Sequence, residues 1–319
     1  MRDKAKHAAY MREWRRKNPE KVAAYNERRR KKKTTQPEKA VPVVWLMTEK
    51  EYRSHSSVSR SELWKISESP EKFRWYKDHP ISSTPALVFG QLTHKLLLQP
   101  ESFDDEFAVA PNCDRRTKAG KEEYDAFIQT VGDRTVVSYD DYEKALDMIT
   151  TARMSPLVNR FLEGLKEIPF FWTDELTGEN CKCRLDCLTE IDGQYYIVDY
   201  KTTGNAQTEI FSNKDVFRFG YFFQAAMYSE GVMHGLNLTE RPKFVFIVQE
   251  KQAPYSVNVI GVSDEVMLAG LDKFRELIGI YHQCRVMDYW YGYNGAFNEL
   301  NETTVPGWMQ LGVDEGEDE

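Results

Sequence analysis

The chain has few cysteines and no long apolar run, and these absences argue against two common classes of protein. None of its apolar stretches approaches the roughly 20 residues that span a bilayer, and its basic N-terminus lacks the apolar core of a secretion signal. Its five cysteines are an odd number and suggest no disulfide framework. We therefore expect no membrane association and a reducing, cytoplasmic environment. The 319 residues suffice for one large globular domain with tails.

Three of the cysteines lie close together, but they lack the paired Cys-x-x-Cys spacing of zinc sites. They are Cys181, Cys183 and Cys187. On a strand these three side chains would share one face, the face opposite Asp186. We expect them to be reduced and packed as buried apolar side chains rather than bound to a metal.

Charge is distributed unevenly along the chain. The net charge is −7, yet residues 1–33 hold fourteen Lys and Arg against four acidic residues. Alanine and aromatic residues interleave with these charges, and the Asn18-Pro19 pair interrupts them, which predicts two short basic helices. We expect this arm to contact DNA through residues such as Arg28, Arg29 and Arg30. A solvated tail is the alternative.

The most informative stretch is a predicted hairpin centred on Asp192 and Gly193. Asp-Gly suits a two-residue type I′ turn, because both positions need positive φ, and alternating runs flank it. If these two residues form the loop, Asp186 lies directly opposite Asp199, with Cα atoms about 4.5–5.5 Å apart. Lys201 then emerges on the same face.

Two carboxylates held this close need a counter-charge, because like charges directly opposed destabilise a sheet. Mg²⁺ prefers oxygen ligands and often uses one or two carboxylates together with phosphate and water. A lysine beside the metal can orient or deprotonate an attacking water and stabilise negative charge. The pattern therefore predicts a magnesium-dependent hydrolytic site, and an exposed hairpin with incidental charges is the alternative.

These residues and a downstream Gln-x-x-x-Tyr follow one another in the order of a known nuclease branch. Arg184-Leu185-Asp186, Asp199-Tyr200-Lys201 and Gln224 with Tyr228 resemble the RecB-like branch of the PD-(D/E)XK nucleases. Segments 61–73 and 90–101 are similar to the RecE-type phage exonucleases (exonuclease eight). The resemblance covers roughly residues 58–287. It implies an α/β fold with a central mixed β-sheet flanked by helices, to which this chain adds the basic helical arm.

The resemblance also implies roles for individual residues. Asp186 and Asp199 would hold the metal, while Lys201 would position the attacking water. A Gly-x-x-x-His segment would place His94 beside the metal, whereas a lone histidine on an apolar helix otherwise fits a core position. The implied metal contacts are His94, Asp186, Asp199, the backbone carbonyl of Tyr200 and Glu167, for which an exposed strand-end glutamate is the alternative. Gln224 and Tyr228 share a helix face that would contact DNA.

A second basic cluster contains Arg115, Arg116 and Lys118. In a mostly acidic body these side chains could meet a phosphate backbone, and a solvated face is the equal alternative. The resemblance compares this cluster with an arch or loop region of related exonucleases.

Periodicity and cap signals predict the remaining elements. We expect helices at 61–77 (capped by Ser61, with a second start at Ser69), 84–98, 121–131, 139–153, 158–165, 213–232 and 264–287 (capped by Ser263). We expect strands at 107–110, 167–172, 243–249 and 255–262. The chain then divides into a basic helical arm and linker at 1–43, a nuclease domain at 44–289, and an aromatic, then acidic, tail at 290–319.

The function that the resemblance implies is a Mg²⁺-dependent, ATP-independent exodeoxyribonuclease, with Mn²⁺ able to substitute. It would resect linear double-stranded DNA from 5′ to 3′ and leave 3′ single-stranded overhangs for phage-type recombination. Expected partners are DNA ends, further copies of the chain in a ring, and a single-strand annealing protein or recombinase. The protein would be encoded by a phage or prophage and act in the cytoplasm of a bacterial host cell. Two alternatives remain: a non-catalytic DNA-binding accessory protein on a nuclease fold, and an endonucleolytic or Cas4-like repair nuclease.

Overall fold

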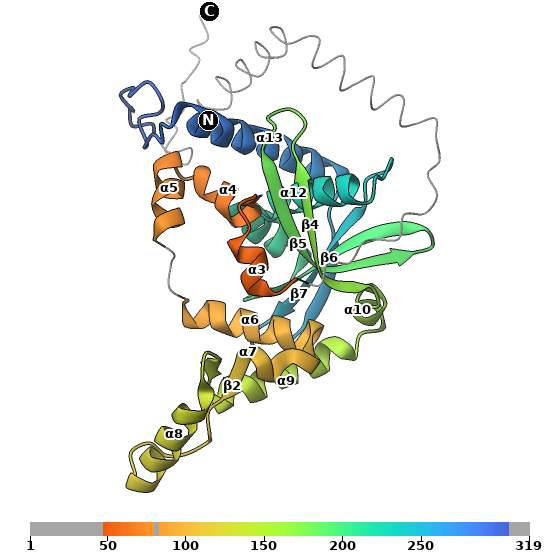
Figure 1. Cartoon of the computed structure of the whole chain (residues 1–319). Helices are drawn as coiled ribbons and strands as arrows, with labels where there is room; N and C mark the ends of the chain where they lie inside the picture. The colour runs from red at the N-terminus through yellow and green to blue at the C-terminus, as the bar shows by residue number, and fades with distance from the viewer. Residues whose placement is uncertain (1–46, 80–82, 306–319) are drawn as a thin grey trace, which may run out of the picture.

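The computed structural model describes residues 47–79 and 83–305, which form a central mixed sheet flanked by helices (Figure 1). This confirms the expected α/β fold. The helices are α3 (Glu49–Ser54), α4 (Arg60–Ile66), α5 (Pro70–Asp78), α6 (Pro85–Leu98), η1 (Pro100–Ser102), α7 (Phe103–Glu106), α8 (Lys118–Val131), α9 (Tyr139–Arg153), α10 (Pro156–Phe161), α11 (Thr208–Ile210), the π-helical η2 (Phe211–Val216), α12 (Tyr221–Gly235) and α13 (Asp264–Met287). Arg28, Arg29 and Arg30 of the predicted arm lie outside the described residues.

The main sheet combines parallel and antiparallel pairs. Its strands are β1 (Val58–Ser59), β4 (Leu165–Thr173), β5 (Asn180–Ile191), β6 (Gln194–Thr203), β7 (Lys243–Glu250) and β8 (Val257–Gly261). Their order is β1-β5-β6-β7-β8, and β4 pairs with the other edge of β5. Strands β6 and β7 are parallel and are joined through α12, whereas β7 and β8 are antiparallel. Two further short strands, β2 (Phe107–Val109) and β3 (Thr135–Val137), pair separately.

The β5–β6 hairpin has the predicted turn and register. Asp192 and Gly193 both adopt positive φ, at 53° and 81°, and Ile191 pairs with Gln194. The pairing of β5 with β6 ends at Cys187–Val198, one step before Asp186 and Asp199. On the same edge, β1 pairs only with residues 181–182 of β5. Among the residues described, 183–186 therefore have no strand partner on this edge, and the two aspartates lie where β5 and β6 separate.

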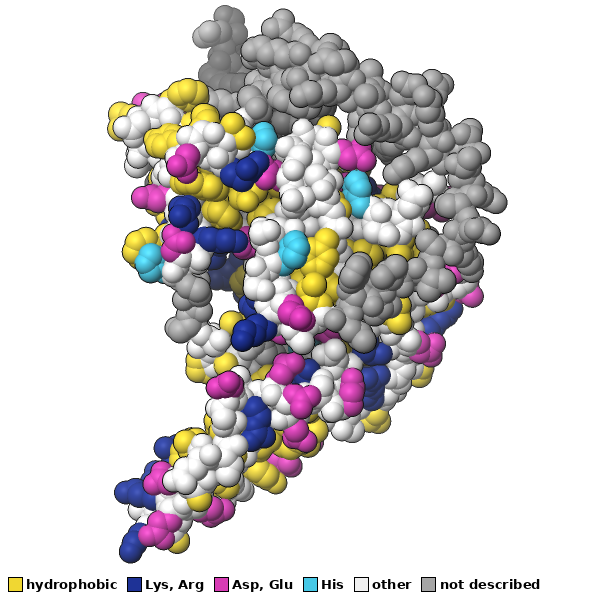
Figure 2. Space-filling view, in the orientation of Figure 1, with side chains coloured by type: hydrophobic (Ala, Val, Ile, Leu, Met, Phe, Trp, Pro, Cys, Tyr) yellow, Lys and Arg dark blue, Asp and Glu magenta, His cyan; other side chains and the backbone are white. Residues whose placement is uncertain are grey.

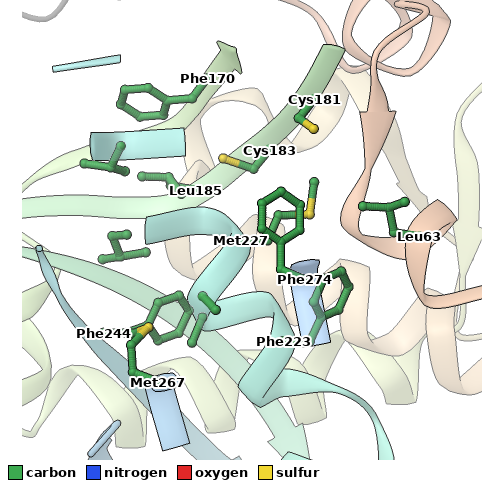
Figure 3. Close-up of a cluster of buried hydrophobic side chains, with 14 of the residues drawn as sticks. Leu63, Phe170, Cys181, Cys183, Leu185, Phe223, Met227, Phe244, Met267 and Phe274 are labelled. Carbon is green, nitrogen blue, oxygen red and sulfur yellow. The ribbon is translucent and has the colours of Figure 1, made fainter. Parts of the chain in front are cut away.

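Apolar side chains cover both faces of the sheet, so the domain has three layers. One core cluster joins the sheet to α4, α12 and α13 and includes Leu63, Phe223 and Phe274 (Figure 3). A second cluster joins the other face to α6, α9 and α10 through residues such as Leu97 and Ile247. No membrane-crossing helix occurs in the described part of the chain, since none there combines sufficient length with sufficient apolar character.

The clustered cysteines are free and buried, as predicted, but they do not share one face. Cys181, Cys183 and Leu185 point into the first core cluster (Figure 3), whereas Cys187 packs in the second. The prediction that the three cysteines share one face is therefore wrong for Cys187, because the regular alternation of faces along β5 stops between Leu185 and Cys187. The break falls at Asp186, where the pairing with β6 has already ended.

Helix boundaries agree with the sequence where a local signal marks the end. Ser263 caps α13 as predicted, and α9 has the predicted bounds. The predicted cap at Ser61 is wrong: Ser59 accepts from the backbone N–H of Glu62, whose side chain accepts from the backbone N–H of Ser59, forming a capping box. The helix predicted at 158–165 ends earlier, at Phe161, because Leu165 already belongs to β4.

The helix predicted at 213–232 is interrupted before α12. Gly220 has a φ of 68°, in the left-handed region that glycine adopts without steric cost, so η2 and α12 are separate helices. The π-helical η2 also departs from the regular period that the prediction assumed.

Two segments outside the sheet and its covering helices differ in how they contact the rest of the domain. α8 projects away from the body and buries only Gly120 and Val131 (Figure 1). The start of the aromatic tail instead packs on the body, where the Trp290 ring stacks on Phe73 at 5.0 Å between ring centroids.

The contact between α12 and α13 depends on a glycine, which gives a matched test of packing. A Cβ at Gly270 would lie 2.1 Å from the backbone oxygen of Phe222, whereas a Cβ at Gly90 of α6 meets no atom within 4 Å. Alanine improves helix propensity at both positions by about 1 kcal/mol. We expect Gly90→Ala to raise the free energy of unfolding by about 0.5–1 kcal/mol and Gly270→Ala to lower it by about 1–3 kcal/mol. Urea denaturation measures both, and equal effects would contradict the packing.

Candidate active site

Acidic residues from three neighbouring strands meet where β5 and β6 separate. Glu167 of β4 lies opposite Asp186 of β5, between the Lys166–Cys187 and Ile168–Leu185 pairs. Asp186 and Asp199 lie one residue beyond the last β5–β6 pair, Cys187–Val198, where the two strands separate. The backbone N–H of Tyr200 donates to Asp186 Oδ2 at 2.8 Å, so β6 still contacts the Asp186 side chain after the strand pairing has ended.

The backbone of Glu167 is itself unusual. Its φ of 56° is in the left-handed region, which a non-glycine residue adopts at a cost of about 1–2 kcal/mol. Such a conformation persists only where the surroundings impose it. Here two side-chain contacts hold the carboxylate: Arg184 Nε lies 2.8 Å from Oε2, and His94 Nδ1 lies 3.5 Å from Oε1.

A histidine from helix α6, which packs on one face of the sheet, completes a group that could bind a metal. His94, on α6, places Nε2 3.0 Å from Asp186 Oδ1. One atom each from His94, Glu167 and Asp186 lies within 4.8 Å of the other two. The His94 side chain is 31% exposed, so solvent reaches the group from that side. We call these three residues the ligand group.

Asp199 lies beside the ligand group and has different partners. Lys201 Nζ is 2.5 Å from Asp199 Oδ2, and Gln224 of α12 donates from Nε2 to Oδ1. The Asp199 side chain is only 2% exposed, so the carboxylate depends on the ion pair with Lys201 and the hydrogen bond from Gln224. Gln224, which the resemblance assigned to DNA, therefore orients Asp199 in this structure.

The crowded charges shift the protonation equilibria of the site. Burial alone would lower the pKa of His94, but the carboxylates of Asp186 and Glu167 outweigh it and raise the pKa to about 9. Burial raises the pKa of Asp199 to about 6, partly opposed by Lys201. Burial would lower the pKa of Lys201, but Asp199 and Asp186 keep it above its usual value. The lysine is therefore held as a cation beside a carboxylate.

Two residues that sequence reasoning did not assign to the site support Glu167. Arg184 pairs with Glu167 on one side and with Glu49 of α3 on the other. Arg184 stands two residues before Asp186, so the strand period places it near the site. No local sequence pattern marks Glu49 as a residue near the site, because its contact with Arg184 joins segments that are far apart in the sequence.

The ligand group has the chemistry of a divalent-cation site. Two carboxylates and one imidazole provide oxygen and nitrogen donors, a set that suits Mg²⁺ or Mn²⁺ better than softer metals. Glu167 Oε1 is buried and accepts no hydrogen bond from any residue that the structure describes. An unpaired buried acceptor is costly, and a bound cation would satisfy it.

The remaining predicted residues are near the site or on the projection. Tyr228 of α12 is half-buried, and burial, together with neighbours that include Asp199 and Asp186, raises the pKa of its phenol well above the usual value. Arg115, Arg116 and Lys118 are exposed at the start of α8, where Arg115 stacks on Tyr124 at 4.0 Å. Their role in binding DNA stays a prediction.

Strand order, register and site together define a class of protein. A mixed sheet that presents an Asp on one strand and Asp-x-Lys on the next, with helices on both faces, is a PD-(D/E)XK-like nuclease fold. The chain belongs to the family described as a PDDEXK-like domain of unknown function (DUF3799), which matches residues 59–303. The predicted fold is thereby confirmed, while the RecE-type assignment stays a prediction.

One solved structure has a similar fold. A protein from Eubacterium rectale, described as a candidate exonuclease, is similar with a TM-score of 0.50 and 15% identity over 82% of this chain and 97% of that one. A second structure, of the protein SSO0001, has a TM-score of 0.33 and 12% identity over 72% of this chain and 81% of that one, too low to support an argument. No curated protein matches the chain in sequence.

Direct metal binding tests the ligand group and its support. We expect Glu167→Gln to weaken Mn²⁺ binding because it removes a charged ligand. We expect Arg184→Gln to weaken it about 10- to 100-fold, as loss of a residue that orients a ligand does elsewhere. Calorimetric titration with Mn²⁺ measures both, and Asp192→Asn at the hairpin tip is the matched acidic control. Unchanged affinity in Glu167→Gln would remove this residue from the site.

Proposed function

We propose that this protein is a divalent-metal-dependent exodeoxyribonuclease that uses Mg²⁺, with Mn²⁺ as a substitute, on the ends of linear double-stranded DNA. The observation that carries the proposal is the position of the ligand group directly beside the Asp199–Lys201 pair. Degradation from 5′ to 3′ without ATP, leaving 3′ overhangs for recombination, rests on the resemblance to RecE-type exonucleases. The same resemblance supports a ring of identical subunits and an annealing protein as partner.

The residues divide the work of phosphodiester hydrolysis. A bound divalent cation would stabilise charge on the phosphate and lower the pKa of the attacking water. His94, Glu167 and Asp186 would hold it, with Asp199 on the adjoining strand. Lys201, kept positive by its neighbours, is suited to orient the water and to stabilise the developing negative charge rather than to act as a base. Gln224 keeps Asp199 aimed at the lysine.

Positive charge lies away from the site as well as in it. Figure 2 shows Lys and Arg side chains at the far end of the projection that α8 forms. Arg115, Arg116 and Lys118 are exposed there. Because the whole chain is acidic, with a net charge of −7, such local basic surfaces would provide the contacts with the phosphate backbone.

Cleavage of end-labelled DNA tests the catalytic assignment. We expect Lys201→Ala to abolish Mg²⁺-dependent cleavage and to leave binding of duplex DNA largely intact, since the substitution removes a charge needed for the reaction rather than the fold. Lys243→Ala, an exposed lysine at the start of β7, is the matched control and should keep its activity. Cleavage by Lys201→Ala at the unaltered rate would contradict the assignment.

The form of the DNA that is cut distinguishes this proposal from other functions of the fold. Progressive release of nucleotides from 5′ ends of linear duplex agrees with it. Cutting of closed circles would instead indicate an endonuclease, and binding without any cleavage would indicate an accessory protein.

Salt dependence of binding tests the two basic segments. Each phosphate contact with duplex DNA releases counterions, so log K falls as log salt rises. The loss of one contact reduces the steepness of this slope by about 0.9. We expect deletion of residues 1–33, and separately the combined Arg115→Gln, Arg116→Gln and Lys118→Gln variant, to weaken binding and flatten this slope. Arg160→Gln, an exposed residue paired with Asp192 at the hairpin tip, is the control. A segment whose removal leaves the slope unchanged makes no phosphate contact.

A further inference from the structure

Two exposed aromatic rings flank an arginine on the connection between η2 and α12. Phe217 is 46% exposed and Phe219 is 43% exposed, although phenylalanine is usually buried. Arg218, between them, is also exposed, and its guanidinium lies 5.4 Å from the Phe219 ring centroid. We call Phe217, Arg218 and Phe219 the aromatic turn. No carboxylate pairs with Arg218 in residues 47–79 and 83–305, so its charge is available to a ligand.

The conformation of the aromatic turn is held by its neighbours. Gly220 has positive φ, and a Cβ there would lie 2.7 Å from the Trp64 ring, so glycine is required both by the backbone and by space. Arg60 of α4 donates from its guanidinium to the backbone carbonyl of Phe219. The Phe217 ring packs on Phe222 at 5.2 Å between centroids. The rings are therefore exposed on a fixed backbone rather than on a loose loop.

The aromatic turn adjoins the catalytic lysine through one side chain. The Phe219 and Tyr221 ring centroids are 5.7 Å apart, and Lys201 Nζ lies 4.9 Å from the Tyr221 centroid. The guanidinium of Arg60 lies 5.8 Å from the same ring. A nucleic acid strand with its scissile phosphate at Lys201 would thus have neighbouring nucleotides within reach of the turn.

Arg60 has an incomplete set of partners. Its Nε is buried without a hydrogen-bond partner, and within the described ranges no acidic side chain forms an ion pair with it. Within the described residues, its guanidinium donates one hydrogen bond, to the carbonyl of Phe219. Asp199 is near enough to favour the charged form of Arg60 but forms no ion pair with it in residues 47–79 and 83–305, so the guanidinium can still contact a phosphate.

We propose that the aromatic turn and Arg60 form a subsite for unpaired nucleotides next to the scissile phosphate. The rings of Phe217 and Phe219 stack on bases, and the guanidinium of Arg60 contacts the backbone phosphate. Aromatic rings interleaved with cations bind single strands in this way, because every base offers a flat apolar face. The proposal rests on the proposed nuclease function, since it takes the phosphate at Lys201 as its reference point.

If the rings stack on the bases, removing the bases should weaken DNA binding only when the rings are present. The full chain carrying Lys201→Ala is titrated with a fluorescent duplex that ends in three unpaired thymidines on each strand. It is titrated again with the same duplex in which those thymidines are abasic. We expect loss of the bases to weaken binding by about 5- to 100-fold. Adding Phe217→Leu and Phe219→Leu, which keep apolar bulk, should remove this difference. Phe297→Leu, an exposed ring after α13, should preserve it.

Arg60→Gln probes the phosphate contact separately. It should weaken binding of the abasic duplex, which keeps the backbone phosphates but offers no bases to the rings, so that any effect of Arg60 on the aromatic turn does not enter. If Arg60→Gln leaves the affinity for the abasic duplex unchanged, the phosphate contact is absent and the proposal is overturned.

The other results that would overturn the proposal are distinct. The double leucine variant could keep the full difference between the two duplexes, or the unaltered rings could bind both equally. An altered subunit number in the double variant, with the duplex ratio unchanged, would assign the patch to contact between copies. Failure of the nuclease assignment is scored independently, from cleavage of linear duplex by the protein with Lys201 in place, and the affinity ratios decide the subsite in either case.

Discussion

The main constraint on this structure is that three carboxylates lie side by side in the sheet and repel one another. Glu167, Asp186 and Asp199 occupy adjoining strands where water is largely excluded, and like charges so placed destabilise a sheet. Each carboxylate has a cation from a different position: Arg184, His94 and Lys201, respectively. The helix that carries His94 and the strands that carry the other two cations are therefore linked by charge as well as by apolar packing.

This arrangement explains why the site is both strained and incompletely satisfied. Glu167 keeps a left-handed backbone conformation and an unpartnered oxygen, two costs that a well-packed strand would normally avoid. Strain and unsatisfied acceptors concentrate where a protein must bind a charged ligand. The apolar clusters on both faces of the sheet stabilise the domain and offset the destabilising effect of the site.

Much of the fold follows from local signals in the sequence. The Asp192-Gly193 turn determines the hairpin register from Ile191–Gln194 to Cys187–Val198, and that register brings Asp186 and Asp199 to the point where the strands separate. Contacts between distant segments leave no comparable local trace. The Glu49–Arg184 pair, the break at Gly220 under the Trp64 ring and the change of face at Cys187 each depend on how separate layers pack. His94 and Glu167 became site candidates only through resemblance to a family, since their spacing does not show that they meet.

One strand carries both a carboxylate of the site and the anchor of the first described helix. Lys182 donates to the backbone oxygens of Tyr52 and His55 at 2.8 and 2.7 Å, so it closes the C-terminal end of α3. Four residues further along β5 is Asp186. Displacement of α3, which follows the basic segment in the chain, would pull on this strand and on the Glu49–Arg184–Glu167 chain of ion pairs together. Helix α3 and the candidate active site are in this way linked through β5 and through ion pairs.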